Sequence, residues 1–106
     1  PHPFVRREES DLYMTLPITV GEAMHGAEVS VPTFDGSVTL KIPPGSQSGR
    51  KLRLRGLGVP VKGGTRGDLY AEMQIVLPDP PTDAARRAVD ELQRAYKRDV
   101  RQDLKL

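Results

Sequence analysis

The side chains that most often carry chemistry are scarce in this sequence and are not grouped. The two histidines, His2 and His25, have no partner at a spacing used by a metal site or a catalytic pair. Cysteine is absent, which excludes disulfides and thiolate metal ligands. None of the serines has the sequence context of a nucleophile elbow. The sequence therefore predicts a protein that is not an enzyme and that holds no metal and no cofactor.

A glycine-rich stretch from residue 56 to residue 67 loosely resembles a phosphate-binding loop. No Gly-Lys-Ser or Gly-Lys-Thr follows it, and the next predicted element is a strand. A phosphate would then lack the helix N-terminus that normally binds it. We interpret the stretch as a mobile hairpin loop whose glycines satisfy the backbone geometry.

Basic side chains gather around the same loop and form the main electrostatic feature of the sequence. They are Arg50, Lys51, Arg53, Arg55, Lys62 and Arg66. Such a cluster can bind phosphates or acidic partners. It is also typical of a solvated edge strand, on which charges prevent unwanted pairing. We favour the edge strand, because no aromatic residue is interleaved to stack on bases, and nucleic-acid binding stays the alternative.

The elements that would position these residues are mostly strands joined by turns. Apolar and polar residues alternate in five segments, at residues 12–16, 28–33, 38–42, 52–54 and 69–75. Pro17 is expected to end the first strand. A helical turn is predicted from Thr19 to His25, because Thr19 and Glu22 have the spacing of a capping box. Asp35-Gly36 predicts a tight hairpin.

The period changes after a proline-rich segment at residues 78–81, where an amphipathic helix is predicted. Thr82 is a suitable N-cap for it. One face carries the apolar residues Ala85, Ala88, Val89, Leu92, Ala95 and Tyr96. This face could pack on its own sheet. We favour a homodimer contact instead, because the prolines would hold the helix away and a two-fold contact buries the face in both copies.

The sequence contains few signals for membrane insertion, secretion or cellular location. No apolar run approaches the length of about 20 residues that spans a bilayer, so no membrane partner is expected. The start lacks both an initiator Met and the order of a signal peptide, which predicts a segment of a longer chain. The absence of cysteine permits a reducing compartment, and we expect a cytoplasmic location.

Several segments, in this order, resemble the C-terminal substrate-binding region of DnaJ-type (J-domain) co-chaperones. They are residues 11–18 (DLYMTLPI), 22–36 (EAMHGAEVSVPTFDG), 40–49 (LKIPPGSQSG), 52–60 (LRLRGLGVP) and 67–70 (GDLY). The resemblance covers roughly residues 2–78. It implies a mainly β fold, a small, partly open β barrel or sandwich of about five strands with a short helical turn and a C-terminal amphipathic helix.

The resemblance also implies a domain plan and partners. Residues 1–10 would be an inter-domain junction and strand lead-in, residues 11–78 the second β domain, and residues 79–106 a proline hinge and dimerisation helix. Two copies would join through the helix and hold unfolded polypeptide clients. The full-length protein would support protein folding with the DnaK chaperone, through a J domain that lies outside this chain. A sister group, the curved-DNA-binding co-chaperones, adds nucleic-acid binding and keeps that alternative open.

The family's client pocket is best described in its first β domain, and similarity between the two β domains transfers it to an apolar groove here. The matching positions are Met14, Leu16, Val29 and Val31, with Met73 as a less certain match. A client could add to the groove as an extra strand. An ordinary core would use the same side chains, and core packing is the alternative role for at least half of them.

Overall fold

The structure, a computed structural model of the chain, describes residues 4–79 and 82–106. Along the described chain the elements are β1 (Val5–Glu8), β2 (Asp11–Thr19), α1 (Val20–His25), β3 (Ala27–Thr33), β4 (Gly36–Ile42), β5 (Lys51–Leu54), β6 (Leu69–Val76) and α2 (Asp83–Gln93). Strands dominate up to residue 76, and the longer helix follows them, as the change of period predicts.

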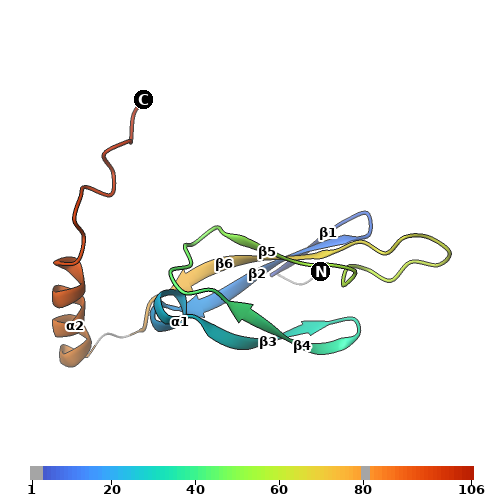
Figure 1. Cartoon of the computed structure of the whole chain (residues 1–106), viewed down its shortest axis with the longest axis horizontal. Coiled ribbons are helices and arrows are strands. Elements are labelled where there is room, and N and C mark those ends of the chain that lie inside the picture. Colours follow the sequence, from blue (N-terminus) through green and yellow to red (C-terminus); the bar gives the residue numbers. More distant parts are fainter. Residues whose placement is uncertain (1–3, 80–81) are drawn as a thin grey trace.

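The strands form two sheets. β2 and β6 run parallel at the centre of a four-stranded sheet in the order β1-β2-β6-β5, and both edge strands are antiparallel to their neighbours. β3 and β4 form a separate hairpin that lies along the larger sheet (Figure 1). The two sheets are not joined into a closed barrel. The prediction of a mainly β, partly open fold with a short helix and a C-terminal helix is confirmed.

The core lies between the two sheets, where alternating side chains of the strands meet. One cluster contains Ile18, Ala23, Ile42 and Met73. A second contains Leu12, Val31 and Leu69. Apolar side chains removed from water in this way supply most of the stability of such a domain.

Local signals place the short helix and the hairpin turn where the sequence predicts them. The Oγ1 atom of Thr19 accepts a hydrogen bond from the Glu22 backbone N–H at 3.1 Å, and the Glu22 carboxylate accepts one from the Thr19 N–H at 2.9 Å. This reciprocal pair confirms the capping box. Gly26 ends the helix at a φ of 80°, and a Cβ there would lie 2.9 Å from the Ile42 carbonyl oxygen. Gly36 follows the hairpin turn with a φ of 95°.

The prediction that Pro17 ends the first strand is wrong. β2 continues through Pro17 to Thr19 and stays paired with β6 over that length. The Leu12 N–H donates towards β6, to the Asp68 carbonyl, whereas the Thr15 N–H donates to Phe4 on the other side. Because N–H groups alternate along a strand, the Pro17 nitrogen faces away from β6. The missing N–H therefore costs β6 no hydrogen bond.

The structure adds a sixth strand, β1, within the segment predicted as a junction and lead-in. Residues 5–8 pair antiparallel with the start of β2, from Val5 opposite Met14 to Glu8 opposite Asp11. The alternation rule misses this strand because Val5 is the only apolar residue in it. The proposed boundaries at residues 10 and 78 stay predictions, and residues 1–3 lie outside the described part of the chain.

The C-terminal helix is shorter than predicted, because α2 ends at Gln93. Ala95 and Tyr96, expected on its apolar face, lie beyond it in a turn in which their N–H groups donate to the carbonyls of Leu92 and Gln93. Figure 1 shows α2 standing apart from the β body, beyond the end at which α1 lies. No residue of α2 is buried, so little tertiary packing stabilises a further turn.

Candidate functional site

An apolar groove lies between the start of the four-stranded sheet and the tip of the β3–β4 hairpin, with a volume of about 430 Å³. β1 and the segment before it, β2, the hairpin and β6 all contribute to it. The lining residues are Phe4, Val5, Leu12, Met14, Thr15, Leu16, Pro17, Pro32, Thr33, Phe34 and Leu69. None of them is charged, so the groove suits an apolar ligand.

The five positions predicted to bind clients separate into two groups. Met14 and Leu16 line the groove. Val31 and Met73 lie in the core, with 0% and 1% of their surfaces exposed, and Val29 is half-buried against the same clusters. The structure therefore places Met14 and Leu16 where a client could reach them, whereas Val31 and Met73 support the sheets beneath. A client-binding role stays a prediction for all five.

Sequence reasoning did not select the two phenylalanines of the groove. Phe34 lies at the hairpin tip and is 61% exposed, and Phe4, just before β1, is 46% exposed. Their signal in the sequence is their context, because Phe34 precedes Asp35-Gly36 in a turn and Phe4 follows two prolines. A large aromatic residue in a turn has no core to enter, which favours a contact role.

The glycine-rich loop is attached to the groove through Arg66. The Arg66 guanidinium donates from Nε to the Gly58 carbonyl at 2.9 Å and from Nη1 to the Asp35 carboxylate at 2.8 Å. Asp35 is the residue after Phe34, so this ion pair holds the hairpin tip against the larger sheet. The loop, predicted to be mobile, is thus held at its base, where the Val59 N–H also donates to the Ser10 carbonyl.

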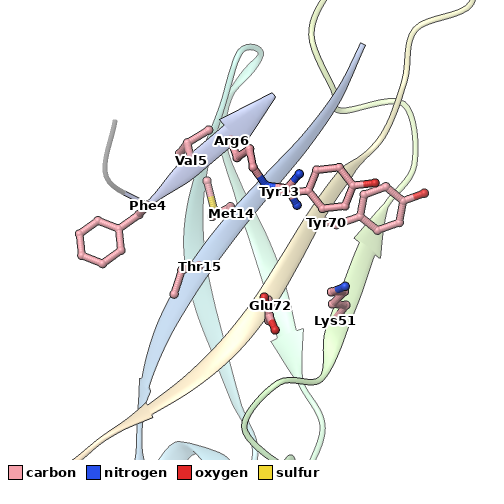
Figure 2. Close-up of a pocket in the computed structure, with 9 residues that line it drawn as sticks. All are labelled: Phe4, Val5, Arg6, Tyr13, Met14, Thr15, Lys51, Tyr70 and Glu72. Atoms are coloured by element: carbon pink, nitrogen blue, oxygen red, sulfur yellow. The ribbon is translucent and has the colours of Figure 1, made fainter. Parts of the chain in front are cut away.

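The outer face of the four-stranded sheet carries a row of aromatic and basic side chains. Tyr13 and Tyr70 stack with ring centroids 5.0 Å apart, and the Arg6 guanidinium lies 4.5 Å from the Tyr13 centroid. Figure 2 shows the two rings side by side, with Arg6 on the far side of Tyr13. Arg53 of β5 is the register partner of Tyr70. Aromatic residues are therefore interleaved with the basic residues in space, although they are not interleaved in sequence.

A second hollow, of about 280 Å³, lies beside this row. Figure 2 shows Phe4 on one side of it, the two tyrosines on the other, and Glu72 and Lys51 nearby. Burial, followed by the charges of Glu8 and Asp11, raises the pKa of the Tyr13 phenol above its ordinary value. Tyr13 is therefore a neutral hydroxyl at physiological pH.

Asp68 organises the junction between the loop and β6. Its carboxylate accepts hydrogen bonds from the Gly56 backbone N–H at 2.8 Å and from Arg53 Nε at 2.7 Å. These bonds, that of Gly56 first, lower the pKa of Asp68 below its ordinary value. The hydrogen bond from Asp68 likewise raises the pKa of Arg53. Arg53 of the basic cluster is thus engaged within the protein.

Replacing Asp68 by Asn is expected to reduce stability more at neutral pH than in acid. Because the folded-state pKa of Asp68 is lowered, its carboxylate stabilises the fold above the unfolded-state pKa of about 4, and this contribution is lost as pH falls through the folded-state pKa. Urea unfolding of the wild type and Asp68→Asn at about pH 7 and about pH 2 measures the difference. An equal difference at both pH values would contradict this role.

The predicted dimerisation residues are accessible on α2 and just after it. Ala85 and Leu92 are half-buried, and Ala88, Val89, Ala95 and Tyr96 are exposed. Val89 is 56% and Tyr96 57% exposed. On the helix itself, Ala85, Ala88, Val89 and Leu92 share one face, as their spacing predicts. The apolar face is uncovered within the described chain, and its pairing with a second copy stays a prediction.

Other kinds of site are not evident in the part of the chain that the structure describes. It contains no group of three or more His, Cys, Asp or Glu side chains arranged to hold a metal. His25 is exposed at the end of α1. Neither of the two helices in this part of the chain has the length and apolarity needed to span a membrane.

Comparison with known proteins finds matches over most of the chain. The family model described as the DnaJ C terminal domain matches residues 1–78. The curved DNA-binding protein of Coxiella burnetii (strain RSA 493 / Nine Mile phase I) is 44% identical over 104 residues, which cover 98% of this chain and 33% of that protein. The chaperone protein DnaJ of Roseiflexus sp. (strain RS-1) is 44% identical over 100 residues, covering 93% and 27%. This chain thus spans a third or less of the length of these relatives.

Proposed function

Because the chain belongs to the DnaJ C-terminal domain family, we propose that it binds or positions unfolded client polypeptide and pairs two copies of its co-chaperone. It is a co-chaperone C-terminal domain. The geometry favours two specific roles for it, which are client binding and the pairing of two copies of the chain. Cooperation with the DnaK chaperone would depend on parts of the protein outside this chain, and a cytoplasmic location fits that role.

The apolar groove is the observation that carries client binding. It is uncharged and has two exposed phenylalanines at its rim, Phe4 and Phe34. Unfolded chains expose apolar side chains that a folded protein buries, and transferring them to such a groove is favourable. Met14 and Leu16 form the wall on β2, and Val31 and Met73 hold the sheets in place from the core.

Replacing Phe34 by Ala is expected to weaken client binding without unfolding the protein. The lost apolar contact should raise the Kd of a fluorescein-labelled heptapeptide with three consecutive leucines about tenfold. Because Phe34 is 61% exposed, the free energy of unfolding should change by less than about 0.5 kcal/mol. Fluorescence anisotropy and urea unfolding measure the two quantities.

Leu77→Ala is the matched control, because Leu77 is 72% exposed and does not line the groove. It should leave the Kd unchanged. If Phe34→Ala binds the peptide as tightly as the wild type and the Leu77→Ala control do, the client site lies elsewhere.

The uncovered apolar face of α2 supports pairing. Ala85, Ala88, Val89 and Leu92 share this face, and none is buried within the chain. Small alanines allow two helices to approach closely, and a two-fold contact would cover the face in both copies at once. The helix stands apart from the β body (Figure 1), which leaves the face accessible to a second copy.

Nucleic-acid binding by the basic strand is the alternative, and the geometry favours it less. Arg53 is paired with Asp68, and Arg66 with Asp35. The Tyr13 ring lies between Arg6 and Tyr70, so both of its faces are already in contact with protein. A base would have to displace one of these neighbours in order to stack on the ring. The alternative stays a prediction.

A further inference from the structure

We infer that the apolar groove binds its client through side chains alone and does not extend the sheet with a client strand. The inference rests on the proposed client-binding function and specifies the mode of recognition. It follows from the direction of the backbone N–H groups around the groove, together with two prolines in its lining, Pro17 and Pro32.

Two hydrogen bonds define the direction of the N–H groups along β2. The Leu12 N–H donates at 2.9 Å to the Asp68 carbonyl, on the β6 side, and the Thr15 N–H donates at 2.8 Å to the Phe4 carbonyl, on the β1 side. N–H groups of successive strand residues alternate between the two sides. Even-numbered residues of β2 therefore donate to β6, and odd-numbered residues face the opposite edge.

Beyond Thr15 this opposite edge of β2 presents no unused N–H group. The next residue that faces it is Pro17, which has no N–H. The one after is Thr19, whose N–H donates to the Glu22 carboxylate at 2.9 Å in the capping box. The edge can still accept a hydrogen bond at the Pro17 carbonyl. An antiparallel ladder, however, needs residues that both donate and accept, so a client strand cannot form one here.

The hairpin and β1 also limit the backbone N–H groups that a client strand could pair with. On the hairpin, Pro32 has no N–H either. On β1, Arg6 pairs with Tyr13, whose N–H points towards β1, so the Arg6 N–H points towards β2. The N–H groups of its neighbours Val5 and Arg7 therefore point outward, away from β2. Of these two, only Val5 lines the groove. β1 is also short and bears three charged residues, which disfavours edge pairing.

The groove therefore selects a client by its apolar side chains and not by its capacity to form a strand. None of the lining residues is charged, and the phenylalanine rim extends the apolar surface outward. The matching partner is a segment that clusters several apolar side chains, whether its backbone is extended or helical.

The test compares three forms of the labelled three-leucine heptapeptide on the full chain. N-methylation of any one leucine nitrogen, which removes a backbone donor and prevents close strand pairing, should change the Kd less than about twofold, below the usual cost of a lost hydrogen bond. Replacing two leucines by serine should raise the Kd at least about tenfold. Anisotropy titrations measure all three.

A protein variant provides a second measurement. Pro17→Ala restores the missing N–H on the edge of β2, and should tighten the unmodified peptide several-fold while making its binding sensitive to N-methylation. Leu77→Ala, away from the groove, should change neither the affinity for the unmodified peptide nor the response to N-methylation.

The possible failures are distinguishable. If the unmodified peptide does not bind, or binds independently of its leucines, the proposed function fails. If it binds through its leucines but N-methylation at alternate positions raises the Kd tenfold or more, strand addition occurs and the inference fails. If Pro17→Ala changes neither the affinity nor its response to N-methylation, the role given to Pro17 as the residue that closes the edge of β2 fails.

Discussion

Met73→Ala is expected to lower the free energy of unfolding by about 2–5 kcal/mol, a large part of the stability of a domain of this size. Met73 is 1% exposed on the central strand β6 and packs with Ile18, Ala23 and Ile42. Truncation would leave a cavity that these neighbours fill only in part. Urea unfolding followed by circular dichroism measures the loss.

Met24→Ala is the matched control, because Met24 is 48% exposed on α1. It should change the free energy of unfolding by less than about 0.5 kcal/mol. The peptide affinity of folded Met73→Ala also separates the two predicted roles of Met73. A large loss of affinity with little loss of stability would place Met73 in the client site and contradict its assignment to the core.

Leu92→Asp is expected to convert a dimer of the chain into monomers. Leu92 is the largest apolar residue on the shared face of α2, so a two-fold contact would bury it in both copies. A carboxylate at this position would be buried without a partner, and the dimer Kd should rise at least about a hundredfold. Sedimentation equilibrium measures the masses of the two proteins.

Arg87→Gln provides the control, because it changes the net charge by the same amount on the other face of α2. It should leave the mass unchanged. Since no residue of α2 is buried in the chain, neither substitution should unfold the β body. A dimer that survives Leu92→Asp would remove α2 from the interface.

Local signals in the sequence predict most of the elements. The alternation of apolar residues predicts the strands β2 to β6, the spacing of Thr19 and Glu22 predicts the cap of α1, and Asp35-Gly36 predicts the hairpin. Each depends on residues near in sequence. The two errors, the missed strand β1 and the strand end expected at Pro17, have tertiary causes. β1 is held by pairing with β2 and not by its own apolar pattern, and Pro17 is tolerated because its nitrogen faces away from β6.

Sequence reasoning could define the apolar face of a strand but not how deeply each residue on that face is buried. Leu12, Met14 and Leu16 alternate identically along β2, yet Leu12 is 8% exposed while Met14 and Leu16 are half-buried and, like Leu12, line the groove. The difference depends on how far the hairpin covers each position, which a period of two residues does not encode. The same holds for Val31 in the core and Phe34 at the rim, three residues apart.

By itself, the sequence determined that this is a β domain of the DnaJ C-terminal family with a separate amphipathic helix, because these properties depend on local spacing and on matching motifs. The tertiary structure alone decided which apolar residues line the groove and which backbone groups around it can still donate. Both depend on strand register and on coverage by distant segments, and neighbouring residues in the chain do not specify them.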